Sequence, residues 1–417
     1  MPMRARPYPV PGATYRLQLG RHLTFDGVAA LAGYLAGLGI SHAYLSPILR
    51  VRRGSTHGYD VVEHGELNPE LGTLEDFLAM ARELRRHGLG ILLDVVPNHM
   101  AVGGDDNRYW LDVLAHGRRS RYAEWFDIDW TPPDPELAGK VLLPMLGEPY
   151  AQALRSGVLR LAFDAATQTF AVWAHGTHKL PLDPRTYGAV LAHAPGGEPL
   201  AAVAAINADA AALDALIGLQ HWRIAHHSAA RKINYRRFFT VNDLAGIRVE
   251  REEVFEHVHR LVFALVEEGL VEGLRIDHVD GLFDPRRYCR ELRRRCPRPV
   301  YVAVEKILAP REWLPEDWGV DGATGYEFGA RVTNLMADPA GEVVLTAAYG
   351  EVTGRRDSIA EIIHRAKLEV LDHDFAAEFG ALVGRLHALV PATGRDALRA
   401  ALRQVVARLD VYRTYVD

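Results

Sequence analysis

The sequence has few cysteines, no long apolar run and no strong excess of charge. Cys289 and Cys296 are the only 2 cysteines in 417 residues. They lack further cysteines or paired histidines at metal-ligand spacing, which favours free thiols over a disulfide or a zinc site. No stretch is long enough to cross a bilayer, and no apolar run follows the basic residues near the N-terminus. We therefore expect neither a membrane span nor a secretory signal, and infer a cytoplasmic protein.

The composition is that of an ordinary globular protein, with 48% hydrophobic and 24% charged residues. A chain of 417 residues can form two or three domains, or one large α/β barrel with insertions. The formal net charge of -5 gives no electrostatic reason to expect nucleic acid or an anionic membrane as partner. A neutral or polar partner fits better.

Apolar periodicity predicts alternating strands and helices in the first part of the chain. Residues 13–19, 40–47 and 91–96 have strand patterns, and 25–38 and 74–87 have helical spacing. Such alternation implies parallel pairing through right-handed crossovers. We expect a loop over 48–73, a helix over 252–268, and buried strands starting at Gly273 and Val302.

Between Asn98 and about Pro199 the alternation breaks down into a segment rich in Trp, Pro and Asp. An insertion of this size after a strand suggests a small subdomain over a barrel mouth. Its tryptophans, Trp110, Trp125 and Trp130 among them, could form a lid that excludes water or could be packing anchors, and both interpretations stay open.

About six strands are clear, fewer than the eight that close a barrel. Beyond Ala330 the pattern is helical, and Val411–Asp417 alternates like the beginning of a seventh strand. The expected fold is an α/β (β/α)8 TIM-type barrel that ends after about six strands, with an inserted subdomain and a helical tail. The expected divisions are 1–97 (first barrel segment), 98–218 (inserted subdomain), 219–330 (second barrel segment) and 331–417 (helical segment).

Polar residues gather at the ends of three predicted strands. Arg275, Asp277 and His278 follow one strand, Glu305 ends the next, and Asp94 begins a third group that continues to Asn98 and His99. Strand ends converge at one face of a barrel, so Asp277 and Glu305 could form a carboxylate pair for retaining glycoside chemistry. From spacing alone, a structural ion pair between Arg275 and Asp277 is an equally good interpretation.

Histidines elsewhere do not predict a metal site. His221, His226 and His227 have no carboxylate partner at helical spacing, so carbohydrate contact or packing is favoured over metal binding. We expect no cofactor.

Three motifs together resemble the α-amylase-type glycoside hydrolases of family 13: Asp94-Val-Val-Pro-Asn-His99, Gly273-Leu-Arg-Ile-Asp-His278 and the strand ending at Glu305. A narrower resemblance, to the maltooligosyltrehalose synthase family, covers nearly the whole chain. It rests on Thr14-Tyr-Arg-Leu-Gln18, Tyr44-Leu-Ser-Pro-Ile48, Gly54-Ser-Thr-His-Gly-Tyr-Asp60, Ile233-Asn-Tyr-Arg-Arg-Phe-Phe239, Asp277-His-Val-Asp-Gly-Leu282 and Glu305-Lys-Ile-Leu308.

The resemblance implies roles for individual residues. Asp277 matches the nucleophile, Glu305 the general acid/base, and Arg275 the residue that orients the nucleophile. Tyr59 matches a tyrosine that stacks on the sugar beside the cleaved bond. The residues that it implies in substrate binding are Tyr59, Asp60, His57, Asp94, Asn98, His99, His278 and Lys306. Asn98 also matches a calcium ligand of many amylases, but no acidic partners can be identified, so we expect no metal.

The implied activity is conversion of the reducing-end α-1,4 bond of a maltooligosaccharide to an α,α-1,1 bond in trehalose biosynthesis. A trehalose-releasing hydrolase would be a functional partner. The family's third catalytic carboxylate is expected beyond residue 417, so activity of this chain alone is open. The alternatives are an α-glucan hydrolase or other transglycosylase of the same superfamily, and an inactive truncated glucan-binding fragment.

Overall fold

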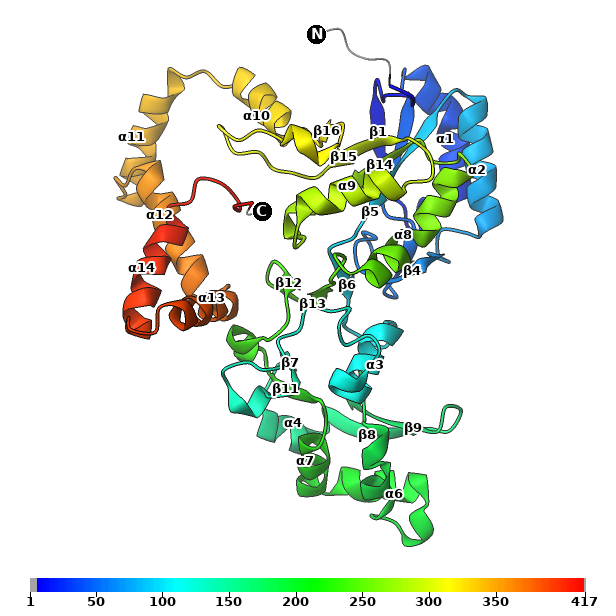
Figure 1. Cartoon of the computed structure of the whole chain (residues 1–417), viewed down its shortest axis with the longest axis vertical. Coiled ribbons are helices and arrows are strands. Elements are labelled where there is room, and N and C mark those ends of the chain that lie inside the picture. Colours follow the sequence, from blue (N-terminus) through cyan, green and yellow to red (C-terminus); the bar gives the residue numbers. More distant parts are fainter. Residues whose placement is uncertain (1–5, 416–417) are drawn as a thin grey trace.

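The computed structural model describes residues 6–415, and a six-stranded parallel sheet lies in its upper part in the view of Figure 1. The strand order is β1-β2-β5-β14-β15-β16, which leaves β1 and β16 as edges. The sheet is a half-barrel, so the predicted barrel fold and its six strands are confirmed. The strands are β1 (Thr14–Leu17), β2 (His42–Leu45), β5 (Gly90–Val95), β14 (Gly273–Ile276), β15 (Tyr301–Val304) and β16 (Gly322–Ala323).

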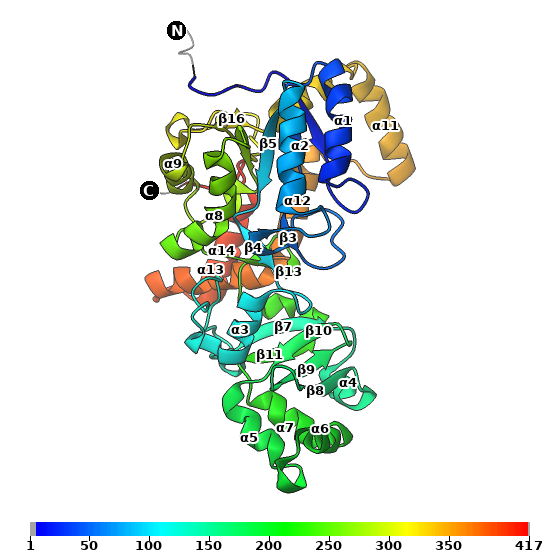
Figure 2. The same cartoon turned by 90° about the vertical axis from the view of Figure 1, so that its right-hand side faces the viewer.

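Amphipathic helices cover the outer face of this sheet, and Figure 2 shows α1 and α2 side by side. In α2 the apolar residues Phe77, Met80 and Leu84 recur at helical spacing and are buried. The helix begins at Thr73, whose side chain forms a capping box with Asp76. These helices are α1 (Phe25–Gly37), α2 (Leu74–Arg86), α8 (Glu252–Glu267) and α9 (Pro285–Arg295).

The segment 48–73, expected to be a loop, contains an antiparallel hairpin of β3 (Leu49–Val51) and β4 (Val61–Leu67). Its pairing is irregular, with register shifts on both sides of Arg50. Strands so short and irregular give little period-2 signal, which is why the sequence pattern did not predict them. The turn between them carries Tyr59 to the carboxyl end of the barrel sheet.

The chain between β6 (His99–Ala101) and β12 (Arg237–Phe238) forms a second lobe with its own hydrophobic core (Figure 1). Trp110, Trp125 and Trp130 are buried in that core, so they are packing anchors. The core continues past residue 218, through β11 and into α8. The elements of the lobe are α3 (Arg108–His116), β7 (Val141–Leu146), α4 (Tyr150–Ser156), β8 (Leu159–Asp164), β9 (Thr169–Ala174), β10 (His178–Pro181), α5 (Tyr187–Leu191), α6 (Pro199–Ala208), α7 (Ala210–Gly218) and β11 (Trp222–His226).

A small antiparallel sheet of β6 (His99–Ala101), β13 (Val241–Gly246) and β12 (Arg237–Phe238) joins the lobe to the half-barrel (Figure 1). Within residues 6–415 no single helix is long and apolar enough to span a membrane. The helices α6 and α7 reach that length and apolarity only when they are counted together, and the chain bends by 108° between them.

The tail after β16 is helical, as predicted, and its last segment returns to the half-barrel. The predicted strand over 411–417 is wrong for residues 411–415, which pair with no strand; residues 416 and 417 lie outside the described part. Side-chain contacts hold the segment instead, because Arg413 donates to the carbonyls of Asp280 and Leu282. The tail helices are α10 (Tyr326–Leu335), α11 (Gly341–Thr353), α12 (Ile359–Asp372), α13 (Ala376–Leu389) and α14 (Arg395–Ala407).

Candidate active site

One guanidinium, that of Arg275, joins three carboxylates from three neighbouring strands. Arg275 and Asp94 are paired across β14 and β5, and Arg275 Nη1 lies 2.7 Å from both Asp94 Oδ1 and Asp277 Oδ1. Its Nη2 lies 3.1 Å from Glu305 Oε1. The strand-end expectation that Asp277 and Glu305 converge is therefore met in the geometry, with Asp94 beside them.

Asp277 is buried, and only one of its oxygens is occupied. Oδ1 accepts from Arg275, whereas Oδ2 is buried without a hydrogen-bond partner among the described residues. Burial raises the pKa of Asp277 to about 7, against the pull of Arg275 and helped by the nearby negative charges of Asp94 and Glu305. An oriented carboxylate with one uncommitted oxygen is the arrangement that a nucleophile needs.

Both carboxylate oxygens of Asp94 accept hydrogen bonds, and its side chain is fully buried. Its Oδ2 accepts from the hydroxyls of Tyr59 at 2.6 Å and Tyr44 at 3.1 Å. Arg16 donates to the Tyr59 hydroxyl at 2.8 Å. Burial raises the pKa of Asp94, and the charge of Arg275 opposes that rise. In this structure Asp94 orients Tyr59 and Arg275.

Glu305 is more accessible than the other two carboxylates. Its side chain is 20% exposed, against 8% for Asp277. The backbone N–H of His278 donates to Oε2 at 2.9 Å, and the Tyr326 hydroxyl donates to Oε1 at 3.1 Å. Accessibility together with fixed hydrogen bonds suits a group that exchanges a proton with a bound molecule.

Two histidines lie beside these carboxylates, and both are buried enough to favour the neutral ring. Burial lowers the pKa of His99 to about 3, and burial also lowers the pKa of His278. His99 Nε2 lies 3.2 Å from the Tyr59 carbonyl. The His278 ring lies 4.9 Å from the Phe238 ring and 5.0 Å from the Phe239 ring. Neutral histidines can donate and accept hydrogen bonds with sugar hydroxyls.

The side-chain oxygen of Asn98 is hydrogen-bonded to an arginine. Arg236 Nη1 donates to Asn98 Oδ1 at 2.6 Å and to the Gly281 carbonyl at 3.1 Å. A guanidinium at the amide oxygen repels a cation at that position. Among residues 6–415, no group of three or more His, Cys, Asp and Glu side chains is arranged to hold a metal ion.

The three predicted residues in the turn of the β3–β4 hairpin lie in different surroundings. Tyr59 reaches the site through Asp94. His57 is exposed and stacks on Tyr59 with ring centroids 6.2 Å apart. Asp60 is buried and accepts from the Ser55 hydroxyl, so in this structure it shapes the turn.

Lys306 is not placed to contact a saccharide, which corrects the expectation that it binds substrate. Its side chain is 0% exposed, and Nζ lies between Asp280 and Glu312. Side chains alternate along extended backbone, so the residue after Glu305 points away from the site.

Four further side chains at the site were not predicted: Arg16, Tyr44, Arg236 and Tyr326. Arg16 and Tyr44 are the second-last residues of β1 and β2 and belong to the Thr14–Gln18 and Tyr44–Ile48 motifs, so the strand-end argument could have identified them. Tyr326 begins α10 three residues after β16, so the same argument applied to a sixth strand end at 322–328 could have identified it.

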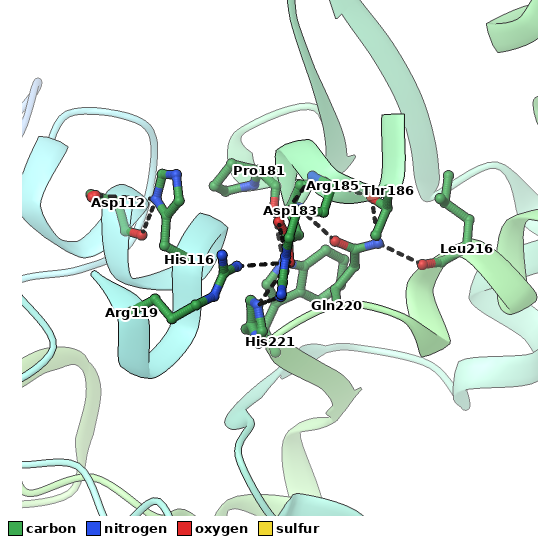
Figure 3. Close-up of polar contacts among 11 residues, drawn as sticks. Asp112, His116, Arg119, Pro181, Asp183, Arg185, Thr186, Leu216, Gln220 and His221 are labelled. Atoms are coloured by element: carbon green, nitrogen blue, oxygen red, sulfur yellow. Dashed lines mark hydrogen bonds and ion pairs between the residues drawn. The ribbon is translucent and has the colours of Figure 1, made fainter. Parts of the chain in front are cut away.

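The histidines of the second lobe do not converge on a site. His221 joins a polar cluster around the buried Asp183, which also accepts from Arg119 and Arg185 (Figure 3). His226 instead bonds Ser228. Because the Asp183 carboxylate is fully engaged, the cluster joins η1 (Gly117–Arg119), η3 (Pro184–Thr186) and the residue before β11 rather than binding a ligand.

Comparisons with known proteins agree with the motifs. Residues 22–169 match the family model described as alpha amylase, catalytic domain. The Mycobacterium tuberculosis protein named "Putative maltooligosyl trehalose synthase" is 35% identical over 408 residues, which cover 94% of this chain and 48% of that protein.

Solved structures give the same result. The maltooligosyltrehalose synthase from Arthrobacter ramosus superposes with a TM-score of 0.82 at 35% identity, covering 97% of this chain and 48% of that one. The DSM5389 glycosyltrehalose synthase has the same TM-score of 0.82 and 35% identity, covering 97% of this chain and 51% of that one. The predicted resemblance is confirmed, and the chain spans about half the length of the relatives that it matches.

Proposed function

We propose that this chain is the N-terminal, catalytic portion of a maltooligosyltrehalose synthase, (1→4)-α-D-glucan 1-α-D-glucosylmutase. The observation that carries the proposal is the Arg275 guanidinium, which contacts Asp94, Asp277 and Glu305, while Asp277 Oδ2 has no hydrogen-bond partner among residues 6–415. Similarity along 94% of the chain to a protein named for this activity supports the choice of reaction.

In the proposed reaction Asp277 attacks the anomeric carbon of the penultimate glucose of a maltooligosaccharide. Glu305 gives its proton to the leaving glycosidic oxygen, and a β-glycosyl ester forms on Asp277. The released glucose turns and offers its anomeric hydroxyl to the same carbon, while Glu305 takes back the proton. Arg275 offsets the negative charge that Asp277 regains as the ester breaks. The net result is a retained configuration and an α,α-1,1 bond.

Transfer rather than hydrolysis requires that water be excluded while the glucose turns. The lobe built from α3 to β11 joins the half-barrel next to His99 and is our candidate for part of that enclosure. We propose a cytoplasmic location, with a trehalose-releasing hydrolase as the enzyme that uses the product.

Product analysis with maltopentaose tests the proposal. The chain is incubated alone, and together with a separately expressed C-terminal portion of a homologous synthase. We expect a non-reducing, trehalosyl-ended product in the combined reaction, and none when Asp277→Asn replaces the wild type. Glucose and shorter maltooligosaccharides without that product would favour a hydrolase or another transglycosylase. No turnover in either reaction, with binding retained, would favour a glucan-binding fragment.

A further inference from the structure

Lys306 is a fully buried charged side chain near the site, and its ammonium forms ion pairs with two separate segments. Nζ lies 3.1 Å from Asp280 Oδ2 and 2.7 Å from Glu312 Oε1. The ammonium also lies 5.7 Å from the centre of the Tyr415 ring. Lys306 directly follows Glu305, so whatever fixes its side chain also restrains the backbone that carries the Glu305 carboxylate.

The other end of the connection is the turn after the nucleophile. Asp280 belongs to η6 (Val279–Gly281), which begins two residues after Asp277. The Tyr415 hydroxyl donates to Asp280 Oδ1, and Arg413 Nη1 donates to the Asp280 carbonyl at 3.0 Å. This turn is therefore held by side chains from two distant segments, one following β15 and one following α14.

The turn matters because it sets the backbone of His278. His278 has φ 44° and ψ 48°, a left-handed conformation that a residue with a side chain adopts only when its surroundings enforce it. In that conformation its N–H donates to Glu305 Oε2 at 2.9 Å. The same carboxylate also meets Arg275 Nη2 and the Tyr326 hydroxyl, and Asp277 lies nearby.

We infer that Lys306 is a positioning residue for proton transfer: by tying Asp280 to the strand end of Glu305, it holds the His278 N–H against the Glu305 carboxylate. The inference rests on the proposed roles of Asp277 and Glu305. A merely structural Lys306 would stabilise the fold without governing that one hydrogen bond.

The test variant has to keep the buried charges balanced. Lys306→Met alone would leave the carboxylates of Asp280 and Glu312 without their shared cation, and a buried unpaired charge can prevent folding. Lys306→Met with Glu312→Gln removes one positive and one negative charge. A matched control is Arg293→Met with Asp321→Asn, which removes an ion pair of 2.8 Å near the opposite end of β15.

The first measurement does not depend on activity. The chemical shift of the His278 amide is followed by NMR as a function of pH. The change in shift that disappears in Glu305→Gln is the change caused by ionisation of Glu305. In the Lys306/Glu312 double variant we expect this change in shift to be at most half as large as in the wild type. The chemical shift of the Val302 N–H, which donates to Asp321 at 2.8 Å, should depend on pH as it does in the wild type. An unchanged His278 titration in a folded double variant would overturn the inference.

The second measurement uses two substrates that differ in their need for an acid. Cleavage of maltopentaose requires a protonated leaving oxygen, whereas fluoride leaves α-maltosyl fluoride without one. We expect the double variant to lose at least about tenfold in kcat on maltopentaose and much less on the fluoride. Equal losses on both substrates would contradict a role in proton transfer. If the wild type used neither substrate, the proposed function would fail, and the NMR titration would still decide the positioning role.

Discussion

Arg275 Nη1 donates to Asp277 Oδ1 at 2.7 Å, while the second oxygen of Asp277 is buried without a hydrogen-bond partner in the described part of the chain. The arginine fixes the carboxylate plane, and one oxygen stays available for attack. This is why we assign the nucleophile to Asp277 and not to Asp94, whose two oxygens both accept hydrogen bonds.

Asp277→Asn should abolish turnover and leave maltooligosaccharide binding measurable. The amide keeps the shape of the carboxylate but cannot form the glycosyl ester. Titration calorimetry with maltopentaose reports binding, and chromatography of the products reports turnover. Residual turnover within about tenfold of the wild type would exclude Asp277 as nucleophile.

The pH dependence of stability should carry the signature of Asp277. Its pKa is raised to about 7 in the folded chain, above the value of about 3.9 expected when unfolded. The folded state then binds more protons than the unfolded state between these values, so this group lowers stability as pH rises from about 4 to about 7. Urea unfolding of the wild type and of Asp277→Asn at several pH values measures the difference.

The raised pKa of Asp277 also predicts how a second variant, Asp94→Asn, behaves. Asp94→Asn removes a negative charge that raises the pKa of Asp277. The Asp277-dependent fall in stability should therefore end at a lower pH in Asp94→Asn than in the wild type. A transition at the same pH would show that burial alone raises the pKa.

Gly281→Ala should weaken saccharide binding. A Cβ at Gly281 would lie 2.3 Å from His278 Cδ2 and 2.6 Å from Asn98 Oδ1, so the His278 ring or Asn98 must move. We expect maltooligosaccharide affinity to fall by about tenfold, or roughly 1.4 kcal/mol. Gly188→Ala is the control, because a Cβ there meets nothing within 4 Å. Equal affinities in the two variants would contradict a binding role for His278 and Asn98.

Asp183→Asn should destabilise the second lobe. The Arg185 guanidinium and backbone N–H, with His221, hold the pKa of Asp183 well below its usual range despite burial. A lowered carboxyl pKa stabilises the fold above about pH 4, and that contribution is lost as pH falls towards the folded pKa. We expect a loss of about 3 kcal/mol in the free energy of unfolding at pH 7. The difference in free energy of unfolding between the variant and the wild type should become smaller at acid pH.

Asp134→Asn provides the comparison for that measurement. Its ion pair with Lys232 is largely exposed, with side chains 28% and 67% accessible, so the expected cost is much smaller than that of Asp183→Asn. A similar loss in both variants would mean that the Asp183 cluster has no special part in holding the lobe together.

Regular elements with strong periodicity were predictable from the chain. The helices at Phe25 and Leu74 and the strands at Gly90 and Gly273 lie within a few residues of their expected bounds. The irregular hairpin of β3 and β4 was not predictable, because its ladder is broken by register shifts and its strands of 3 and 7 residues alternate poorly.

Within the candidate site, chemistry was predictable and orientation was not. Asp94, Asp277 and Glu305 could be expected to meet because parallel strands end at one face. Lys306 follows Glu305 in sequence, yet its side chain lies on the opposite side of the backbone, among Asp280 and Glu312.

The sequence by itself determined which strands would form a barrel and which strand ends would be polar, because burial demands apolar strands and excludes charges from their middles. Only the tertiary structure decided how Arg275 is shared among three carboxylates and which oxygen of Asp277 stays uncommitted. Those outcomes depend on register across strands and on the left-handed backbone at His278, which long-range packing imposes and no local pattern encodes.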